Sequence, residues 1–218
     1  MIDELTPIAR YMAAEMSSNA AGADAREMLR LNQTSAERCI AEYNKLPLWM
    51  RLLGLGMTPG QCVNVDITNR QAALIAWALK VRQNGAWDHK PKIAAQFHPR
   101  NPTGPQHWHL YDKTLYFYDV WSNIHYGYVG RAAGFSDSVL LDGAGLEQIG
   151  SDALRGSLAQ CRGALQDGLR ACDAASDRAA IVIGLRLFGD GPVTPERLLQ
   201  AVLRSPDITR KPYVAPTR

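Results

Sequence analysis

The stretch Asp66–Gly85, "DITNRQAALIAWALKVRQNG", decides the fold class that this sequence predicts. Its apolar side chains crowd the positions that a helix would bury, with Ala73, Ile75 and Trp77 among them. Gly85 is a suitable end for that helix, because glycine readily takes the left-handed conformation that terminates helices. The stretch therefore predicts a long helix, and we interpret the segments on either side in relation to it.

The residues before this helix are also typical of helices. The segment "ELTPIARYMAAEM" places Leu5, Ile8, Met12 and Met16 at helical spacing. Pro47 should break or kink the helical pattern that follows. The sequence therefore predicts a helical N-terminal third.

The pattern changes after the long helix. The segment "HWHLYDKTLYFYDVW" alternates with a period of two around a candidate turn at residues 112–114, which predicts a β-hairpin. Helical periodicity then returns, and the last helix begins with Thr194 as N-cap and Pro195 at its first position. We expect a mainly α protein: a single compact helical domain with a small β-hairpin insert. The tail, residues 206–218, is expected to be loose.

Composition excludes several classes of protein. The chain has 218 residues, 46% of them hydrophobic, and a formal net charge of +3, which is too small to indicate nucleic-acid binding. It has neither a basic-apolar secretory signal nor an apolar stretch long enough to span a bilayer, so no membrane insertion is expected. The four cysteines show no metal spacing, and we expect them to be buried or free thiols in a reducing compartment.

Common catalytic signatures are missing from the sequence: it contains no G-x-S-x-G, H-E-x-x-H, P-loop or G-x-G-x-x-G motif. We therefore expect no cofactor. His107 and His109 would share one face of a strand, which suits a metal, but no third ligand is evident nearby. The interpretation we prefer is an exposed polar face, and no metal is expected.

The densest polar chemistry lies between Asp119 and Asp137, "DVWSNIHYGYVGRAAGFSD". We interpret it as the floor of an active site, with Asn123, His125 and Tyr126 on a turn made tight by Gly127 and a second glycine. Histidine is the natural acid or base near neutral pH, so His125 is the candidate proton shuttle. The plainer alternative is a glycine-aromatic turn around a core histidine.

A second polar group, "NGAWDHK", follows the long helix and contains Trp87, Asp88 and Lys90. Its plainer interpretation is a surface turn with Trp87 as a buried plug. Asp177 sits at a predicted helix start, where capping alone would explain it. The sequence predicts that Asp88, Lys90, Asp119 and His125 converge on one cleft, since each follows or begins a regular element.

Three stretches together resemble the bacterial toxin 44 domain, also called polymorphic toxin type 44. They are "GAWDHKPKI", "SNIHYGYVGRAAGFSDSVLLDGAGLEQIG" and "SDRAAIVIGLRLF", and the similarity covers Leu74 to Phe188. The sequence departs from the family pattern at Ser122, where the family has glycine. Carried over by motif position, the resemblance implies these site residues: Asp88, Lys90, Asp119, Asn123, Tyr126, Gly127 and Asp177.

The resemblance also implies a biological setting. The family is held to be largely helical, to form the toxic tip of interbacterial weapons and to have predicted ribonuclease activity. Residues 69–205 would be the catalytic domain, and residues 1–68 a helical segment that packs on it or loads it onto a secretion apparatus or chaperone. The protein would be made in the cytoplasm, neutralised by a cognate immunity protein, and exported into a target cell without a cleavable signal.

Three functions remain open, and the sequence favours the first over the other two. The first is a metal-independent ribonuclease, in which His125 takes the proton from a ribose 2′-hydroxyl, Lys90 stabilises the phosphate and Asp119 or Asp88 orients the base. The second is a peptidoglycan hydrolase using a pair of carboxylates. The third is a non-enzymatic binding module of a secretion or phage particle. The carboxylates available to the second are Asp88, Asp119, Asp137, Asp142 and Glu147.

Overall fold

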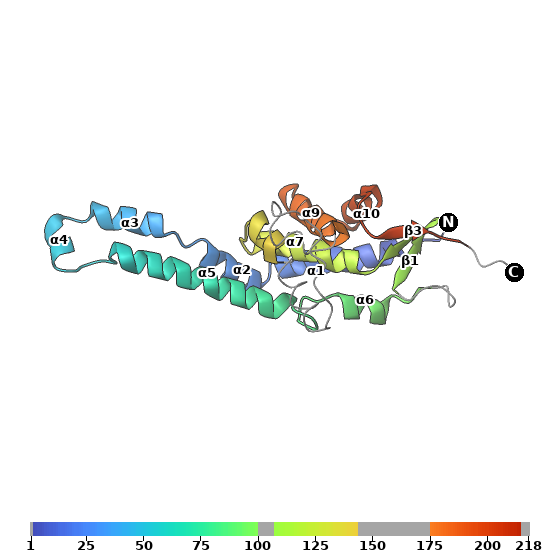
Figure 1. Ribbon diagram of the computed structural model, residues 1–218, viewed down its shortest axis with the longest axis horizontal. Helices are drawn as coiled ribbons and strands as arrows, with labels where there is room; N and C mark the ends of the chain where they lie inside the picture. The colour runs from blue at the N-terminus through green and yellow to red at the C-terminus, as the bar shows by residue number, and fades with distance from the viewer. Residues whose placement is uncertain (1, 100–106, 144–174, 215–218) are drawn as a thin grey trace.

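The computed structural model describes residues 2–99, 107–143 and 175–214. Within these residues the chain is mainly α-helical with a small antiparallel sheet, which confirms the predicted fold class. Figure 1 shows a helical body with an arm that extends from it. The helices are α1 (Leu5–Ala20), α2 (Ala23–Asn32), α3 (Ala36–Lys45), α4 (Leu48–Leu52), α5 (Pro59–Val81), α6 (Lys90–Gln96), α7 (Asp119–Ala132), α9 (Ala175–Gly189) and α10 (Pro195–Arg204). The strands are β1 (Trp108–Tyr111), β2 (Thr114–Phe117) and β3 (Arg210–Pro212), and residues 137–143 are also helical.

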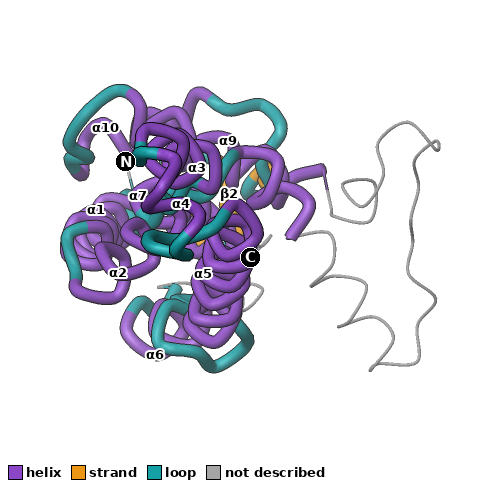
Figure 2. The backbone as a smooth tube through the Cα atoms, turned by 90° about the vertical axis from the view of Figure 1, so that its left-hand side faces the viewer, coloured by secondary structure: helices purple, strands orange, loops and turns teal. Residues whose placement is uncertain are grey.

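Helix α7 is the centre of the body, packed between α1 and α9 (Figure 2). Nine of its 14 residues are buried, which is typical of a helix surrounded by others. Helix α1 supplies one wall of the core and also packs against α10. Five of its side chains are fully buried: Leu5, Ile8, Ala9, Met12 and Met16.

Two glycines bring α7 and α9 into backbone contact. A Cβ on Gly127 would lie 2.2 Å from the carbonyl oxygen of Ile181, and one on Gly184 would lie 2.1 Å from that of Ile124. Real Cβ atoms do not approach backbone that closely, so any larger residue would push the helices apart. The close approach fixes the position of α9 relative to α7.

The expectation of a turn that contains Asn123, His125 and Tyr126 is wrong, because residues 119–132 form the single helix α7. Gly127 permits the contact with α9, and a Cβ on Gly130 would lie 2.4 Å from Leu140 Cδ2. These glycines therefore serve helix packing. The preference of isolated glycine for turns is overridden by tertiary contacts.

The predicted hairpin is confirmed: β1 pairs antiparallel with β2, and the turn contains Asp112 with a φ of 53°. Strand β3 extends this sheet by pairing with β2 in the order β1-β2-β3. The expectation of a loose tail is thus wrong for Arg210–Pro212, because this segment completes the sheet.

The first residues of the chain are attached to the hairpin. The Glu4 amide donates to the Leu110 carbonyl at 2.9 Å, and the Leu110 amide donates to the Glu4 carboxylate at 2.7 Å. Asp3 accepts hydrogen bonds from the amides of Leu5 and Thr6 and so caps α1. Helices α1 and α2 both pack against α7 and therefore belong to the body.

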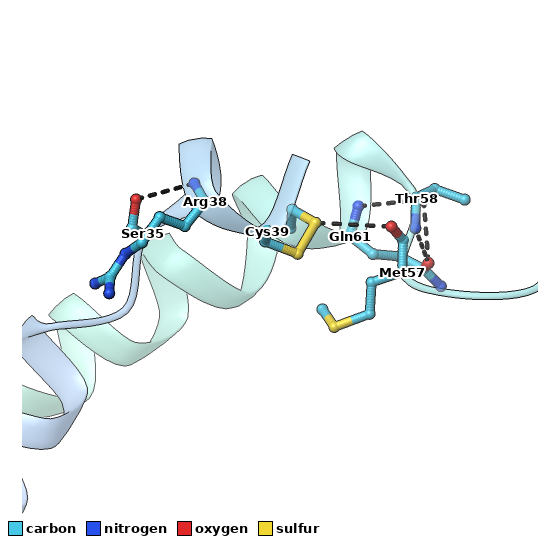
Figure 3. The surroundings of a disulfide bond; sticks show 7 residues. Ser35, Arg38, Cys39, Met57, Thr58 and Gln61 are labelled. Atoms are coloured by element: carbon cyan, nitrogen blue, oxygen red, sulfur yellow. Dashed lines mark hydrogen bonds between the residues drawn. A yellow bond between two sulfur atoms is a disulfide. The ribbon is translucent and has the colours of Figure 1, made fainter. Parts of the chain in front are cut away.

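Helices α3, α4 and the first half of α5 form the arm (Figure 1). A disulfide between Cys39 of α3 and Cys62 of α5 joins its two sides (Figure 3). Ser35 caps α3, and Thr58 forms a capping box with Gln61 at the start of α5. The expectation of free thiols is wrong for this pair, whose helices pack side by side and bring the two sulfurs together. Cys161 and Cys172 lie outside the described residues.

Candidate active site

The turn before α6 carries Asp88 and Lys90. Asp88 is 9% exposed, and its two oxygens accept hydrogen bonds from the amides of Asn84 (2.9 Å) and Lys90 (3.1 Å). A carboxylate that accepts from backbone amides in this way holds a turn in place. Asp88 therefore fixes the conformation from which α6 and Lys90 begin.

Three charged side chains come together from three helix starts. Lys90 is the first residue of α6, Asp119 is the first of α7, and Asp177 lies in the first turn of α9. The Asp119 carboxyl interacts with the charges of both Asp177 and Lys90, and the Lys90 charge also acts on Asp177. We call this group the Lys90–Asp119–Asp177 cluster.

The cluster shifts the acidity of both its carboxyl groups. Burial raises the pKa of Asp119 to about 6, the negative charge of Asp177 adds to the rise, and Lys90 opposes it. Burial also raises the pKa of Asp177, against the effect of Lys90. A helix N-terminus favours the ionised form by about 0.3–1 kcal/mol. Burial and repulsion outweigh that effect here, and Asp119 is left able to give or take a proton near neutral pH.

Tyr118, which sequence reasoning missed, borders the cluster. Burial raises the pKa of its phenol, which also interacts with the charges of Lys90, Asp119 and Asp88. Its ring stacks on His107 with centroids 4.5 Å apart. In the sequence Tyr118 continues the alternation of the hairpin, and its position directly before Asp119 is the one signal that could have singled it out.

Asn123 and Tyr126 follow Asp119 along the same side of α7, at spacings of four and seven residues. Asn123 is half-buried, and its Nδ2 is a buried donor without a partner among the described residues. The Tyr126 hydroxyl donates to the Leu140 carbonyl at 3.1 Å. Asn123 therefore stays a candidate for binding substrate, whereas Tyr126 joins α7 to the helical residues 137–143.

His125 lies in the core and is not part of the cluster. It is fully buried, and its Nε2 is 3.0 Å from Asn19 Nδ2. Its ring centre is 4.3 Å from that of His89, which is also fully buried. Burial lowers the pKa of both imidazoles, that of His89 to about 4. A substrate hydroxyl cannot reach a ring with no exposed face, so this position gives no support to His125 as a proton shuttle.

His89 and Ser122, also missed as site residues, link the two predicted motifs. The His89 amide lies 3.4 Å from Ser122 Oγ, and His89 Nδ1 lies 3.1 Å from the Tyr11 hydroxyl. The "WDHK" turn and α7 thus lie on the same side of the molecule, as the predicted cleft requires. Asp88, Lys90 and Asp119 are brought together, while His125 lies in the core.

The remaining supporting residues lie apart from the cluster. Trp87 is 6% exposed and packs edge to face on Trp77, as the plug interpretation predicts. Asp137 forms an exposed ion pair with Arg131 of the last turn of α7, far from Asp119. Glu147 lies outside the described residues.

The two strand histidines do not share an exposed face. His107 precedes β1 with a φ of 70°, and His109 is 2% exposed. His109 Nε2 lies 2.7 Å from the Phe97 carbonyl, to which it must donate, and this leaves Nδ1 unprotonated. In residues 2–99, 107–143 and 175–214, no group of three or more His, Cys, Asp or Glu side chains is arranged to hold a metal ion.

Comparison with known proteins gives one match. The family model described as bacterial toxin 44 matches residues 76–190, which include every member of the cluster. No curated protein and no solved structure matches the chain. No helix among the described residues is both long and apolar enough to cross a membrane.

Proposed function

Because this chain belongs to the bacterial toxin 44 family, we propose that it is an enzymatic toxin whose acid–base chemistry is carried by the Lys90–Asp119–Asp177 cluster. The observation that supports this most is the pKa of Asp119, raised to about 6 beside a second half-buried carboxyl group. Carboxyl groups poised near neutral pH are typical of general acids and bases. We propose hydrolysis as the reaction.

We propose a glycan, namely peptidoglycan, as the substrate. The cluster places two carboxyl groups against one ammonium, and Asp88 adds a further negative charge nearby. This balance disfavours a polyanion such as RNA, whereas glycosidases use two carboxyl groups. The Cys39–Cys62 disulfide also supports an oxidising compartment such as the one that contains the bacterial wall.

Each member of the cluster then has a role. Asp119 in its protonated form donates to the glycosidic oxygen as the bond breaks. Ionised Asp177 stabilises the positive charge that develops on the sugar ring, until a water molecule adds to the ring and gives one proton back to Asp119. Lys90 favours the ionised form of Asp177, since its charge lowers the pKa of that carboxyl group.

A ribonuclease is the second candidate, and Lys90 is the observation that favours it. An ammonium beside a carboxyl group of pKa about 6 could hold a phosphate while ionised Asp119 takes the proton of a ribose 2′-hydroxyl. In this version Asp119 replaces the buried His125 as the base.

The test uses the purified protein on two substrates, isolated peptidoglycan sacculi and total bacterial RNA. We expect release of soluble wall fragments, and a loss of about 10²–10⁴ in rate for Asp119→Asn. Asp137→Asn is the matched control, because Asp137 lies in an exposed ion pair. This variant is expected to retain activity. Degradation of RNA alone would establish the second candidate, and activity on neither substrate would favour a binding module.

The biological setting is part of the proposal. A toxin that attacks the wall should kill when directed to the periplasm of an expressing bacterium and be harmless in its cytoplasm; a ribonuclease should do the opposite. We propose that a cognate immunity protein blocks the cluster, and that a secretion apparatus or chaperone delivers the protein into the target cell. Co-purification from the producing bacterium would identify both partners.

A further inference from the structure

The end of the arm exposes an unusual amount of apolar surface. We define the arm tip as residues 46–57, which comprise α4 and the loop that leads to α5. Among its exposed side chains Leu52 is 78% exposed, Leu53 70% and Trp49 59%. Soluble proteins rarely leave so many large apolar side chains together in water without a partner. The large apolar side chains exposed at the tip are Leu48, Trp49, Leu52, Leu53, Leu55 and Met57.

We propose that the arm tip inserts into the interface of an anionic phospholipid bilayer. This goes beyond the catalytic proposal and does not depend on it. It also differs from the sequence expectation of no membrane insertion, because the insertion proposed is a shallow one that involves no spanning helix.

The shape of the tip fits a fluid partner. Leu48 and Leu52 lie on one side of α4, while Trp49 and Leu53 lie about 100° around the helix. Leu55 continues the apolar surface into the loop, and Figure 1 shows α4 at the far end of the arm, away from the body. A rigid protein would contact one side of such a convex tip, whereas lipid can surround it.

The backbone of the tip is already hydrogen-bonded. The amides of Met50 and Arg51 donate to Pro47, that of Leu53 to Trp49, and that of Leu55 to Met50, at 3.0–3.2 Å. These amides would therefore keep their partners when the tip enters a lipid interface, where unpaired backbone groups are costly.

The positive charge around the tip favours binding to anionic lipid. Between Glu42 and Asp66 the only charged residues are Lys45 and Arg51, so this stretch is free of acidic side chains. Lys45 pairs with Glu42, but both are about 70% exposed, and such a pair holds a cation weakly. Tryptophan and leucine beside basic residues are the usual composition of segments that lie in a membrane interface.

The test measures sedimentation of the full chain with sucrose-loaded vesicles of phosphatidylcholine and phosphatidylglycerol. We expect binding, and a loss of about a hundredfold in affinity for Leu52→Glu/Leu53→Glu, which removes two apolar side chains from the interface. Both positions are exposed, so thermal melting should not change. Vesicles of phosphatidylcholine alone should bind about tenfold more weakly.

Ile75→Glu/Leu79→Glu is the matched control. It adds the same charge at residues that are 62% and 54% exposed, about 25–30 Å along α5 from the tip, and should bind as the parent does. A parent protein that does not sediment with anionic vesicles, or control and tip variants that lose binding equally, would overturn the proposal. The proposal would also be overturned if the parent protein did not bind vesicles but formed a dimer that Leu52→Glu/Leu53→Glu abolishes, because the tip would then bind a second copy of the chain.

Discussion

At Asp119, the proposed acid–base role and the stability of the fold make opposite demands. Burial and the neighbouring Asp177 raise the pKa of this carboxyl group to about 6, above its ordinary value of 3.8. The folded protein therefore holds the proton more tightly than the unfolded chain does. Asp119 contributes stability below pH 3.8, and that contribution is lost as the pH rises through about 6.

Replacing Asp119 with asparagine should inactivate the protein and stabilise it at neutral pH. Asparagine keeps the shape but carries no charge to bury, so the melting temperature at pH 7.5 should rise, and the gain should disappear near pH 4. Thermal melts at both pH values measure this. Asp137→Asn should change stability by less than about 0.5 kcal/mol, because Asp137 is exposed. A folded Asp119→Asn variant that melts lower at pH 7.5 would show that the carboxylate is stabilising.

The direction of the pH dependence of activity should distinguish the two proposed reactions. If protonated Asp119 is the acid of glycan cleavage, the rate falls as the pH rises above about 6. If ionised Asp119 is the base of a ribonuclease, the rate falls as the pH drops below about 6. In either case Lys90→Gln removes a charge that lowers this pKa, so the midpoint should move to higher pH. The check is a pH–rate profile of both proteins, and an unmoved midpoint would mean that another group titrates.

Helix α7 shows where reasoning from the sequence stops. The hairpin, the long helix α5 and the nearness of Asp88, Lys90 and Asp119 follow from local periodicity and from the ends of elements. The helical state of residues 119–132 could not be predicted in this way, because each glycine disfavours a helix by about 1 kcal/mol. The glycines are needed here for close packing against residues far along the chain, which local sequence does not reveal. The burial of His125 depends on α1 and on His89, and local sequence does not reveal it.

The contact between α7 and α9 should tolerate no side chain at Gly184. Gly184→Ala places a Cβ about 2 Å from backbone, which must move, and should lower the free energy of unfolding by about 3 kcal/mol. Because α9 carries Asp177, activity should fall as well. Gly189→Ala, on the same helix with nothing within 4 Å of the new Cβ, is the control and should be neutral. Chemical denaturation measures both, and equal stability of the two variants would contradict the close packing.

For the whole molecule, the arm and the body are held by different means. The body has a core of large apolar side chains, whereas α3 and α4 contain no buried residue and depend on α5 and on the disulfide. The sequence could not show this pairing, because four cysteines are compatible with free thiols as well as with several connectivities.

Reducing the Cys39–Cys62 bond should loosen the arm and leave the body intact. With a sequence separation of 23 between the cysteines, loop-closure entropy amounts to about 3 kcal/mol, all of it in the arm. Hydrogen exchange with and without reductant should show faster exchange in residues 36–65 and no change in α1 or α7. Cys39→Ser/Cys62→Ser should exchange rapidly in both conditions. Equal loosening of arm and body would mean that the two unfold together.

The contacts of α1 also determine when, during synthesis, the body can fold. Helix α1, near the start of the described chain, packs against α10, near its end. Strand β3, which follows α10, completes the sheet by pairing with β2. The body is therefore complete only when both ends of the described chain are in place. During ribosomal synthesis α1 must wait for α10 to emerge, and pairings between distant segments form slowly. Asp177 comes late as well. The body that holds the Lys90–Asp119–Asp177 cluster can therefore close only after α9 and α10 have been synthesised.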